Sequence, residues 1–133
     1  MTPWRWVCKD VLYAIHDRQL AEHGGLSGVL DAGRLEAALD RQQNLAAYGV
    51  PDAATLAAAY AYGLARNHGF ADGNKRTGWV VARLFLADNG FTLRFDPADA
   101  VLTMESVAAG SLSEPELAEW FRQRILHPRV VSF

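Results

Sequence analysis

Ten consecutive residues, His68 to Thr77, carry side chains suited to chemistry on a phosphate. We predict that Asn74 caps the following helix, which places Lys75 and Arg76 in its first turn. Two cations at that end oppose the helix macrodipole, whereas a bound anion would relieve their repulsion and satisfy the free N–H groups of the turn. This segment therefore indicates an anion site, with phosphate as the expected ligand.

The other residues near this turn fit the same phosphate chemistry. His68 can serve as a general base when its imidazole is neutral. Asp72 offers hard oxygen ligands of the kind that Mg²⁺ prefers. Gly73 allows a positive φ or a close approach of the backbone. Arg66 is expected to reach the same loop, and Phe70 to anchor that loop on the core.

A non-catalytic interpretation of the segment stays open. Asp72, Gly73 and Asn74 also form an ordinary turn and cap, and a Lys–Arg pair on a surface helix is usually solvated. On that interpretation the protein is a helical binding module, and the turn holds an anion or a carboxylate of a partner. The His68→Ala substitution separates the two interpretations, because it removes an enzyme activity and spares pure binding.

The composition indicates one mainly helical domain that positions this segment. The chain has 133 residues, half of them apolar, which is enough for a single packed core. Alanine and leucine supply 38 residues, whereas valine, isoleucine and threonine supply 17, a balance that favours helix over sheet. We predict an all-α fold, a compact bundle of about six helices over residues 1–133, with at most one minor two-stranded β element.

Apolar periodicity and capping residues predict where the elements lie. The helices are expected at about 9–22, 31–40, 53–67, 74–88, 96–109 and 113–125. Trp4–Val7 and Phe91–Phe95 alternate as strands do. Because a lone strand is not stable, we expect these two segments to pair with each other.

Charge and cysteine content exclude several classes of protein. The net charge of −2 argues against a nucleic-acid coat and against a binder of anionic membranes. Cys8 is the only cysteine, which excludes an intrachain disulfide and fits a reducing compartment. No apolar run reaches the ~20 residues of a membrane span. With no signal peptide at the start, we expect a cytoplasmic protein.

His16 and Asp17, in the middle of a helix, are expected to be a polar core pair or a surface pair.

The segment from His68 to Thr77 resembles the signature of the Fic/Doc family. Fic proteins carry H-x-F-x-D/E-G-N-G-R, and the Doc branch has a lysine in place of the second glycine of that motif, as Lys75 does here. The resemblance extends from about Val11 to Ile125. It includes Ile15–Asp17, Gly24–Leu26, Arg41–Asn44 and Leu84–Gly90. This resemblance implies the compact helical Fic fold.

The same resemblance implies a toxin that is paired with a Phd-type antitoxin. The expected activity is a protein kinase reaction that uses ATP and Mg²⁺. It would phosphorylate a Ser or Thr hydroxyl of a translation factor, elongation factor Tu being the expected substrate, and arrest translation. Transfer of AMP, as in the Fic branch, is the nearest alternative. No direct contact with nucleic acid or a membrane is expected.

Carried over by position, the family pattern assigns a role to each residue of the segment. His68 would activate the target hydroxyl, and Asp72 would hold Mg²⁺. Catalysis would depend on His68, Asp72, Lys75 and Arg76. The expected nucleotide-binding residues are Arg66, Gly73, Asn74, Lys75, Arg76 and Thr77. The sequence departs from the Doc pattern at Val80, where that branch carries an asparagine, and Arg83 is the nearby side chain that could reach back.

Overall fold

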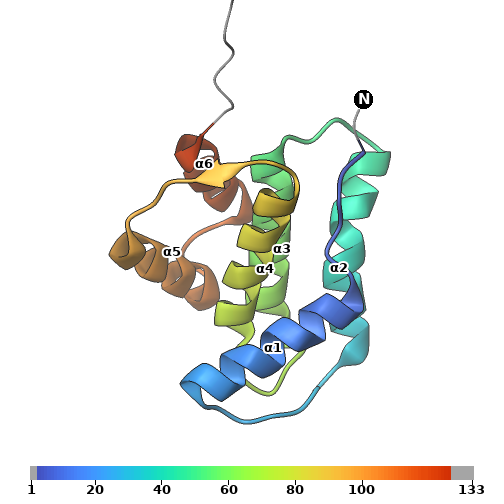
Figure 1. Cartoon of the computed structure of the whole chain (residues 1–133), viewed down its shortest axis with the longest axis vertical. Helices are drawn as coiled ribbons and strands as arrows, with labels where there is room; N and C mark the ends of the chain where they lie inside the picture. Colours follow the sequence, from blue (N-terminus) through green and yellow to red (C-terminus); the bar gives the residue numbers. More distant parts are fainter. Residues whose placement is uncertain (1–2, 127–133) are drawn as a thin grey trace, which may run out of the picture.

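The computed structural model describes residues 3–126, and within them it has six helices and one two-stranded sheet (Figure 1). The helices are α1 (Lys9–His23), α2 (Ala32–Ala47), α3 (Ala53–Asn67), α4 (Asn74–Asp88), α5 (Pro97–Ala109) and α6 (Glu114–Arg124). The mainly helical fold that the composition predicts is confirmed. Among these residues, no helix combines the length and the apolar character needed to cross a membrane.

The alanine-rich helix α3 forms the centre of the bundle. Eleven of its fifteen residues are buried, on all sides of the helix. It packs against α2, α4, α5 and α6, and Figure 1 shows it behind α4 in the middle of the molecule. The small side chains let neighbouring helices come close. A Cβ on Gly78 of α4 would lie 2.9 Å from the carbonyl oxygen of Ala61, so only glycine fits at this crossing.

Side-chain caps fix the starts of four helices as the sequence predicts. Asp31, Asp52 and Asp96 accept backbone N–H groups at the starts of α2, α3 and α5. Ser113 and Glu116 form a complete capping box at the start of α6. Each cap satisfies a backbone donor that the helix itself leaves free. These bonds explain why the predicted starts agree closely with the observed ones.

Helix α2 is longer than predicted, because it continues past Asp40 to Ala47. The polar residues from Arg41 onward look like a helix end, but two of them are held by tertiary structure, one by burial and one by an ion pair. Gln42 is fully buried, and Arg41 forms a two-pronged ion pair with Glu114 of α6. Tertiary contacts therefore extend a helix that local pattern would end.

The predicted pairing of Trp4–Val7 with Phe91–Phe95 is wrong. The sheet instead joins β1 (Thr92–Leu93) to β2 (Ile125–Leu126), antiparallel, with Thr92 opposite Leu126. The segment near Trp4 is extended, but side chains satisfy its backbone. Asn89 bonds both the N–H and the carbonyl of Arg5, and the N–H of Val7 donates to the hydroxyl of Tyr60. Its alternating pattern reflects packing of the two tryptophans on Phe85.

Candidate active site

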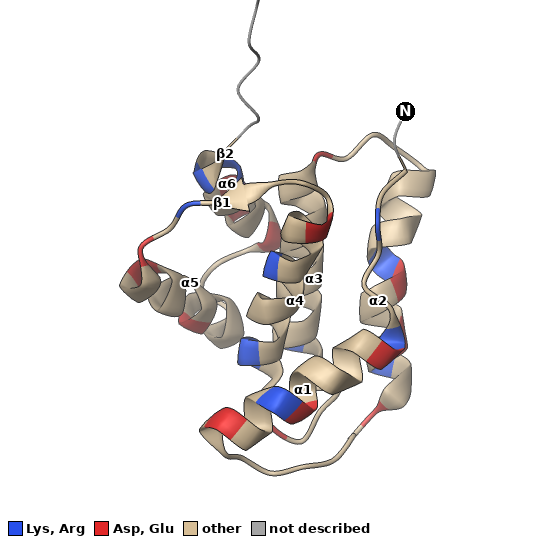
Figure 2. Ribbon diagram, in the orientation of Figure 1, with Lys and Arg blue, Asp and Glu red and all other residues tan. Residues whose placement is uncertain are grey.

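A cleft of about 380 Å³ lies where α3 ends and α4 begins. Figure 2 shows basic residues at the start of α4, beside this junction. The lining residues are Ala65, His68, Ala71, Asp72, Gly73, Asn74, Lys75, Arg76 and Ala108. Six of the residues that the sequence predicts for the site therefore face one hollow, which is large enough for a small-molecule ligand.

His68 ends α3 in an unusual backbone conformation. Its φ of 49° and ψ of 45° are left-handed, and it is the one non-glycine residue with positive φ in the described part of the chain. This position after a helix usually belongs to glycine. A non-glycine residue there costs on the order of 1 kcal/mol, and such strain concentrates at functional sites. The conformation leaves the imidazole exposed at the cleft.

Asn74 has a different structural role from the one predicted. The residue that precedes α4 is Gly73, with φ of 76°, and Asn74 is the first residue of the helix. The side chain of Asn74 spans the preceding loop instead. Its Oδ1 accepts from the N–H of Phe70 at 3.0 Å, and its Nδ2 donates to the Phe70 carbonyl at 2.9 Å. Asn74 therefore holds the loop in shape, which leaves its backbone N–H for a ligand.

The first turn of α4 offers free donors and two cations to the cleft. The N–H groups of Asn74, Lys75 and Arg76 have no partner within the helix, as expected for its first turn. The next N–H, that of Thr77, donates to the Gly73 carbonyl at 3.0 Å. Lys75 and Arg76 both line the cleft. An anion placed here meets aligned N–H dipoles and positive side chains.

Two of the predicted nucleotide-binding residues do not line the cleft. The side chain of Thr77 is fully buried, and its Oγ1 has no hydrogen-bond partner among the described residues. Arg66 is exposed but donates to the carbonyl of Ala108 at 3.0 Å, at the end of α5. Neither Thr77 nor Arg66 is therefore among the residues that line the cleft, although Ala108, the partner of Arg66, is one of them.

Asp72 lines the cleft and is exposed, with its carboxylate held by two backbone donors. It accepts the N–H of Gly73 at 2.8 Å and that of Leu26 at 3.3 Å. These two backbone donors lower the pKa of Asp72, with the Gly73 bond the larger cause, so the group is ionised at neutral pH. Within residues 3–126 no group of three or more acidic, histidine or cysteine side chains could enclose a metal. A single carboxylate fits Mg²⁺ that is held jointly with nucleotide phosphates.

The α1–α2 loop, residues 24–31, lies against the segment that lines the cleft. The N–H of Ala71 donates to Gly28 at 2.9 Å, and the N–H of Leu30 donates to Gly69 at 2.8 Å. Gly25 approaches Asp72 so closely that a Cβ would lie 2.9 Å from its Oδ2. The loop is exposed along its whole length. It thus forms a border beside the cleft that the motif does not predict.

His16 of α1 also contacts the segment, a contact that the sequence did not reveal. Its side chain is 3% exposed, and its Nε2 lies 2.8 Å from the carbonyl oxygen of Asp72. The imidazole stacks on Phe70, with ring centroids 3.6 Å apart. Phe70 itself is 1% exposed, which confirms its predicted role as the apolar anchor. The expectation of a polar core residue holds for His16, whereas Asp17 is exposed.

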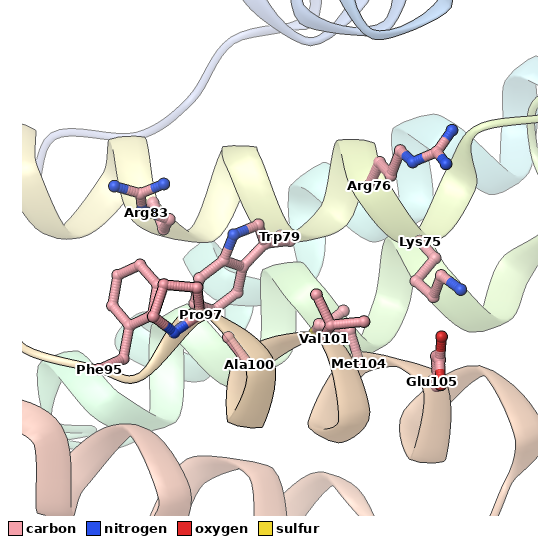
Figure 3. Close-up of a pocket in the computed structure, with 10 residues that line it drawn as sticks. All are labelled: Lys75, Arg76, Trp79, Arg83, Phe95, Pro97, Ala100, Val101, Met104 and Glu105. Atoms are coloured by element: carbon pink, nitrogen blue, oxygen red, sulfur yellow. The ribbon is translucent and has the colours of Figure 1, made fainter. Parts of the chain in front are cut away.

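A second hollow, of about 470 Å³, adjoins the cleft between α4 and α5 (Figure 3). Lys75 and Arg76 line both hollows. At the end of this groove away from Lys75, Arg83 lies over the rings of Trp79 and Phe95, 5.6 Å and 5.0 Å from their centroids. Arg83 therefore points to the aromatic end of the groove and does not reach back to the first turn of α4. Val80 lines neither hollow.

The fold and the site together define a class of protein. The family model described as the Fic/DOC family matches residues 6–86, more than half of the chain, so the chain belongs to this family. The chain is 38% identical over 120 residues to "Protein kinase doc" of Escherichia phage P1. The aligned region covers 90% of this chain and 94% of the phage protein. The chain is also 47% identical over 76 residues to "Toxin Doc" of Mycolicibacterium smegmatis, a match that spans 55% of this chain and 58% of that protein.

Proposed function

We propose that this protein is the toxin of a toxin–antitoxin pair and acts as a protein kinase. It transfers the γ-phosphate of ATP to a Ser or Thr hydroxyl of a translation factor, with elongation factor Tu as the substrate. The observation that carries the proposal is the meeting of His68, Asp72 and the first turn of α4 in one cleft. The similarity to a relative named as a protein kinase over nearly its whole length supports kinase chemistry.

The residues of the cleft suit an in-line phosphoryl transfer. His68 takes the proton of the target hydroxyl while the hydroxyl oxygen forms a bond to the γ-phosphorus. The bond from that phosphorus to the β–γ bridging oxygen breaks, and ADP leaves. Such a transition state needs positioning and charge stabilisation more than covalent help from the protein. Lys75, Arg76 and the free N–H groups of α4 supply that stabilisation.

Asp72 is the group that would hold Mg²⁺ in this site. Its exposed carboxylate stays ionised, and its bonds to Gly73 and Leu26 fix its direction. When bound, the metal neutralises charge on the phosphate oxygens. Because Asp72 is the only carboxylate among the lining residues, we expect Mg²⁺ to bind weakly without nucleotide and tightly with it.

The proposal includes a Phd-type antitoxin that neutralises the toxin. An antitoxin segment that folds as it binds would use a groove on this domain. Co-expression of the neighbouring gene product tests this pairing, and we expect it to restore growth. Growth arrest that persists under co-expression would contradict the pairing, provided that both proteins are present.

A labelling experiment tests the activity directly. The purified protein is mixed with elongation factor Tu, Mg²⁺ and ATP labelled at either the α- or the γ-phosphate. We expect transfer of γ-label only, and its loss in the His68→Ala variant. Transfer of α-label would instead assign the protein to the AMP-transferring branch. If a folded protein that binds ATP transfers neither label to this substrate, the proposed kinase reaction on elongation factor Tu is wrong.

A further inference from the structure

The imidazole of His16 contacts the loop of the candidate site, although His16 lies 56 residues before Asp72 in the chain. Helix α1 packs against α4, and Figure 1 shows it crossing the end of the bundle where α4 begins. From there His16 makes two contacts to the loop before α4. It bonds the carbonyl of Asp72 and stacks on the ring of Phe70.

The hydrogen bond to Asp72 determines the tautomer of His16. A carbonyl oxygen only accepts, so Nε2 of His16 must carry the hydrogen and donate it. The 2.8 Å distance is that of a well-formed N–H···O bond, and the donor is shielded from competing water, since His16 is 3% exposed. The bond therefore fixes the direction of the peptide that joins Asp72 to Gly73.

The direction of this peptide controls where the carboxylate of Asp72 points. The N–H of Gly73 belongs to the same peptide and donates to Oδ1 of Asp72 at 2.8 Å. If the peptide rotated, this bond would break and the carboxylate would lose its larger backbone donor. Gly73 lies directly against the imidazole, because a Cβ there would make ordinary contact, 3.7 Å from the Cδ2 and Nε2 atoms of His16. One side chain of α1 is thus joined to the carboxylate through a single peptide.

We propose that His16 is a positioning residue that aims the Asp72 carboxylate into the cleft by holding the Asp72–Gly73 peptide. The proposal rests on the proposed function, since it assigns that carboxylate to Mg²⁺. Groups that act through a metal ligand in this way commonly change metal affinity by about 10- to 100-fold when they are removed. The competing explanation is that His16 only fills space against Phe70.

Two substitutions of His16 separate these explanations, because one keeps the stacking on Phe70 and the other keeps the hydrogen bond to Asp72. His16→Phe keeps a flat ring for stacking on Phe70 and removes the donor. His16→Gln removes the ring and places an amide donor near the position of Nε2. A residue that only packs is replaced better by phenylalanine, whereas a positioning donor is replaced better by glutamine.

The measurement is the Mg²⁺ concentration that half-saturates ATP binding, determined by calorimetry on the full chain. Thermal unfolding of each variant is recorded alongside. We expect His16→Phe to raise the Mg²⁺ requirement by about 10-fold or more while it stays folded, and His16→Gln to stay within about 3-fold of the wild type.

Tyr13→Leu is the matched control, because Tyr13 meets the edge of Phe70, 5.8 Å between centroids, from the same helix. This control should lower the melting temperature and leave the Mg²⁺ requirement unchanged.

Each other outcome identifies what has failed. If His16→Gln needs as much Mg²⁺ as His16→Phe, or more, His16 acts by packing and the positioning role is overturned. The same conclusion follows if both variants match the wild type. If the wild type binds ATP with no dependence on Mg²⁺, the metal role of Asp72 in the proposed function fails, and the inference fails with it.

Discussion

The strained backbone of His68 shows how a single residue links the core to the cleft. The residue ends the most buried helix of the structure, yet its own side chain is exposed. A glycine would relieve the left-handed strain but would leave no imidazole at the lining of the cleft. We interpret the strain as the cost of placing a base at the end of a rigid element.

This geometry identifies the best substitution for testing the base. Asparagine tolerates the left-handed conformation better than most residues, so His68→Asn should fold as stably as the wild type. We expect its rate of γ-label transfer to fall by about 10²- to 10⁴-fold, the usual contribution of a general base. The measurement is the initial rate of transfer, with thermal unfolding as the control. A rate within about 3-fold of the wild type would contradict the assigned role of His68.

At the scale of residues, the motif predicted which side chains gather and missed several details, of which Thr77 and His16 are the clearest. His68, Asp72 and Lys75 face the cleft because they belong to one turn and its flanks, which local spacing can show. Thr77 does not, because it lies on the inner face of α4 in phase with Val81 and Phe85, both fully buried. That helical phase was readable in the sequence. The contact of His16 was not, since it depends on how α1 packs.

At the scale of elements, the α1–α2 loop makes a matched pair of glycine substitutions possible. Gly25 and Gly28 have φ values of 125° and 123°, so alanine is equally strained at both. A Cβ on Gly25 would press on Oδ2 of Asp72, whereas a Cβ on Gly28 meets nothing within 4 Å. We expect equal losses of stability, to within about 0.5 kcal/mol, in urea unfolding. Only Gly25→Ala should also raise the Mg²⁺ requirement for ATP binding, by about 10-fold. Equal Mg²⁺ requirements in the two variants would show that the loop does not position Asp72.

Helices α3 and α4 provide a second pair of glycines: Gly63 of α3 faces α2, and Gly78 of α4 faces α3. On Gly63 of α3 a Cβ would make an ordinary contact, 3.6 Å from the Cβ of Ala38. Gly63→Ala should stabilise the protein by about 0.5–1 kcal/mol, because alanine has the better helix propensity. On Gly78 the neighbour at 2.9 Å is a backbone oxygen that cannot move alone. Gly78→Ala should destabilise by about 1–3 kcal/mol in urea unfolding. If both changes stabilise, α3 and α4 are packed less tightly than the 2.9 Å approach at Gly78 implies.

The sequence predicted helices well and strand partners poorly, for a physical reason. Helix starts depend on near neighbours, as the aspartate caps of α3 and α5 show. The end of α2 depends on Glu114, 73 residues beyond Arg41. Strand pairing likewise depends on distant segments. Residues 4–7 alternate like a strand because two tryptophans face Phe85, and nothing local shows that Asn89 and Tyr60 take their backbone bonds.

At the scale of the whole molecule, one ion-pair network joins distant parts of the chain and makes stability depend on pH. Asp52 caps α3 and bonds Arg122 of α6 at 2.7 Å. The bond to Arg122 is the largest cause of the lowered pKa of Asp52. A carboxyl group with a lowered pKa in the folded state stabilises fully above its unfolded pKa near 3.8, and this contribution is lost as the pH falls toward the folded value.

Asp52→Asn tests this contribution, because asparagine still caps a helix but does not ionise. We expect a loss of at most about 1 kcal/mol at pH 7, since half of the Asp52 side chain is exposed. The difference from the wild type should shrink as the pH drops below 3.8. Urea unfolding at pH 7 and pH 3 measures both. Asp96→Asn, at the cap of α5, is the control, because the described residues give Asp96 no ion pair. A difference that grows at low pH would contradict the linkage.

The buried alanines of α3 limit which substitutions this protein can accept over evolutionary time. Four other helices, α2, α4, α5 and α6, pack against α3, and His68 follows directly at its end. Larger side chains at Ala57 or Ala61, both fully buried, must therefore move the neighbouring helices. In a population selected to escape growth arrest, inactivating mutations should then arise along this helix as readily as at the motif. The buried centre of the bundle should therefore be as large a mutational target as the proposed active site.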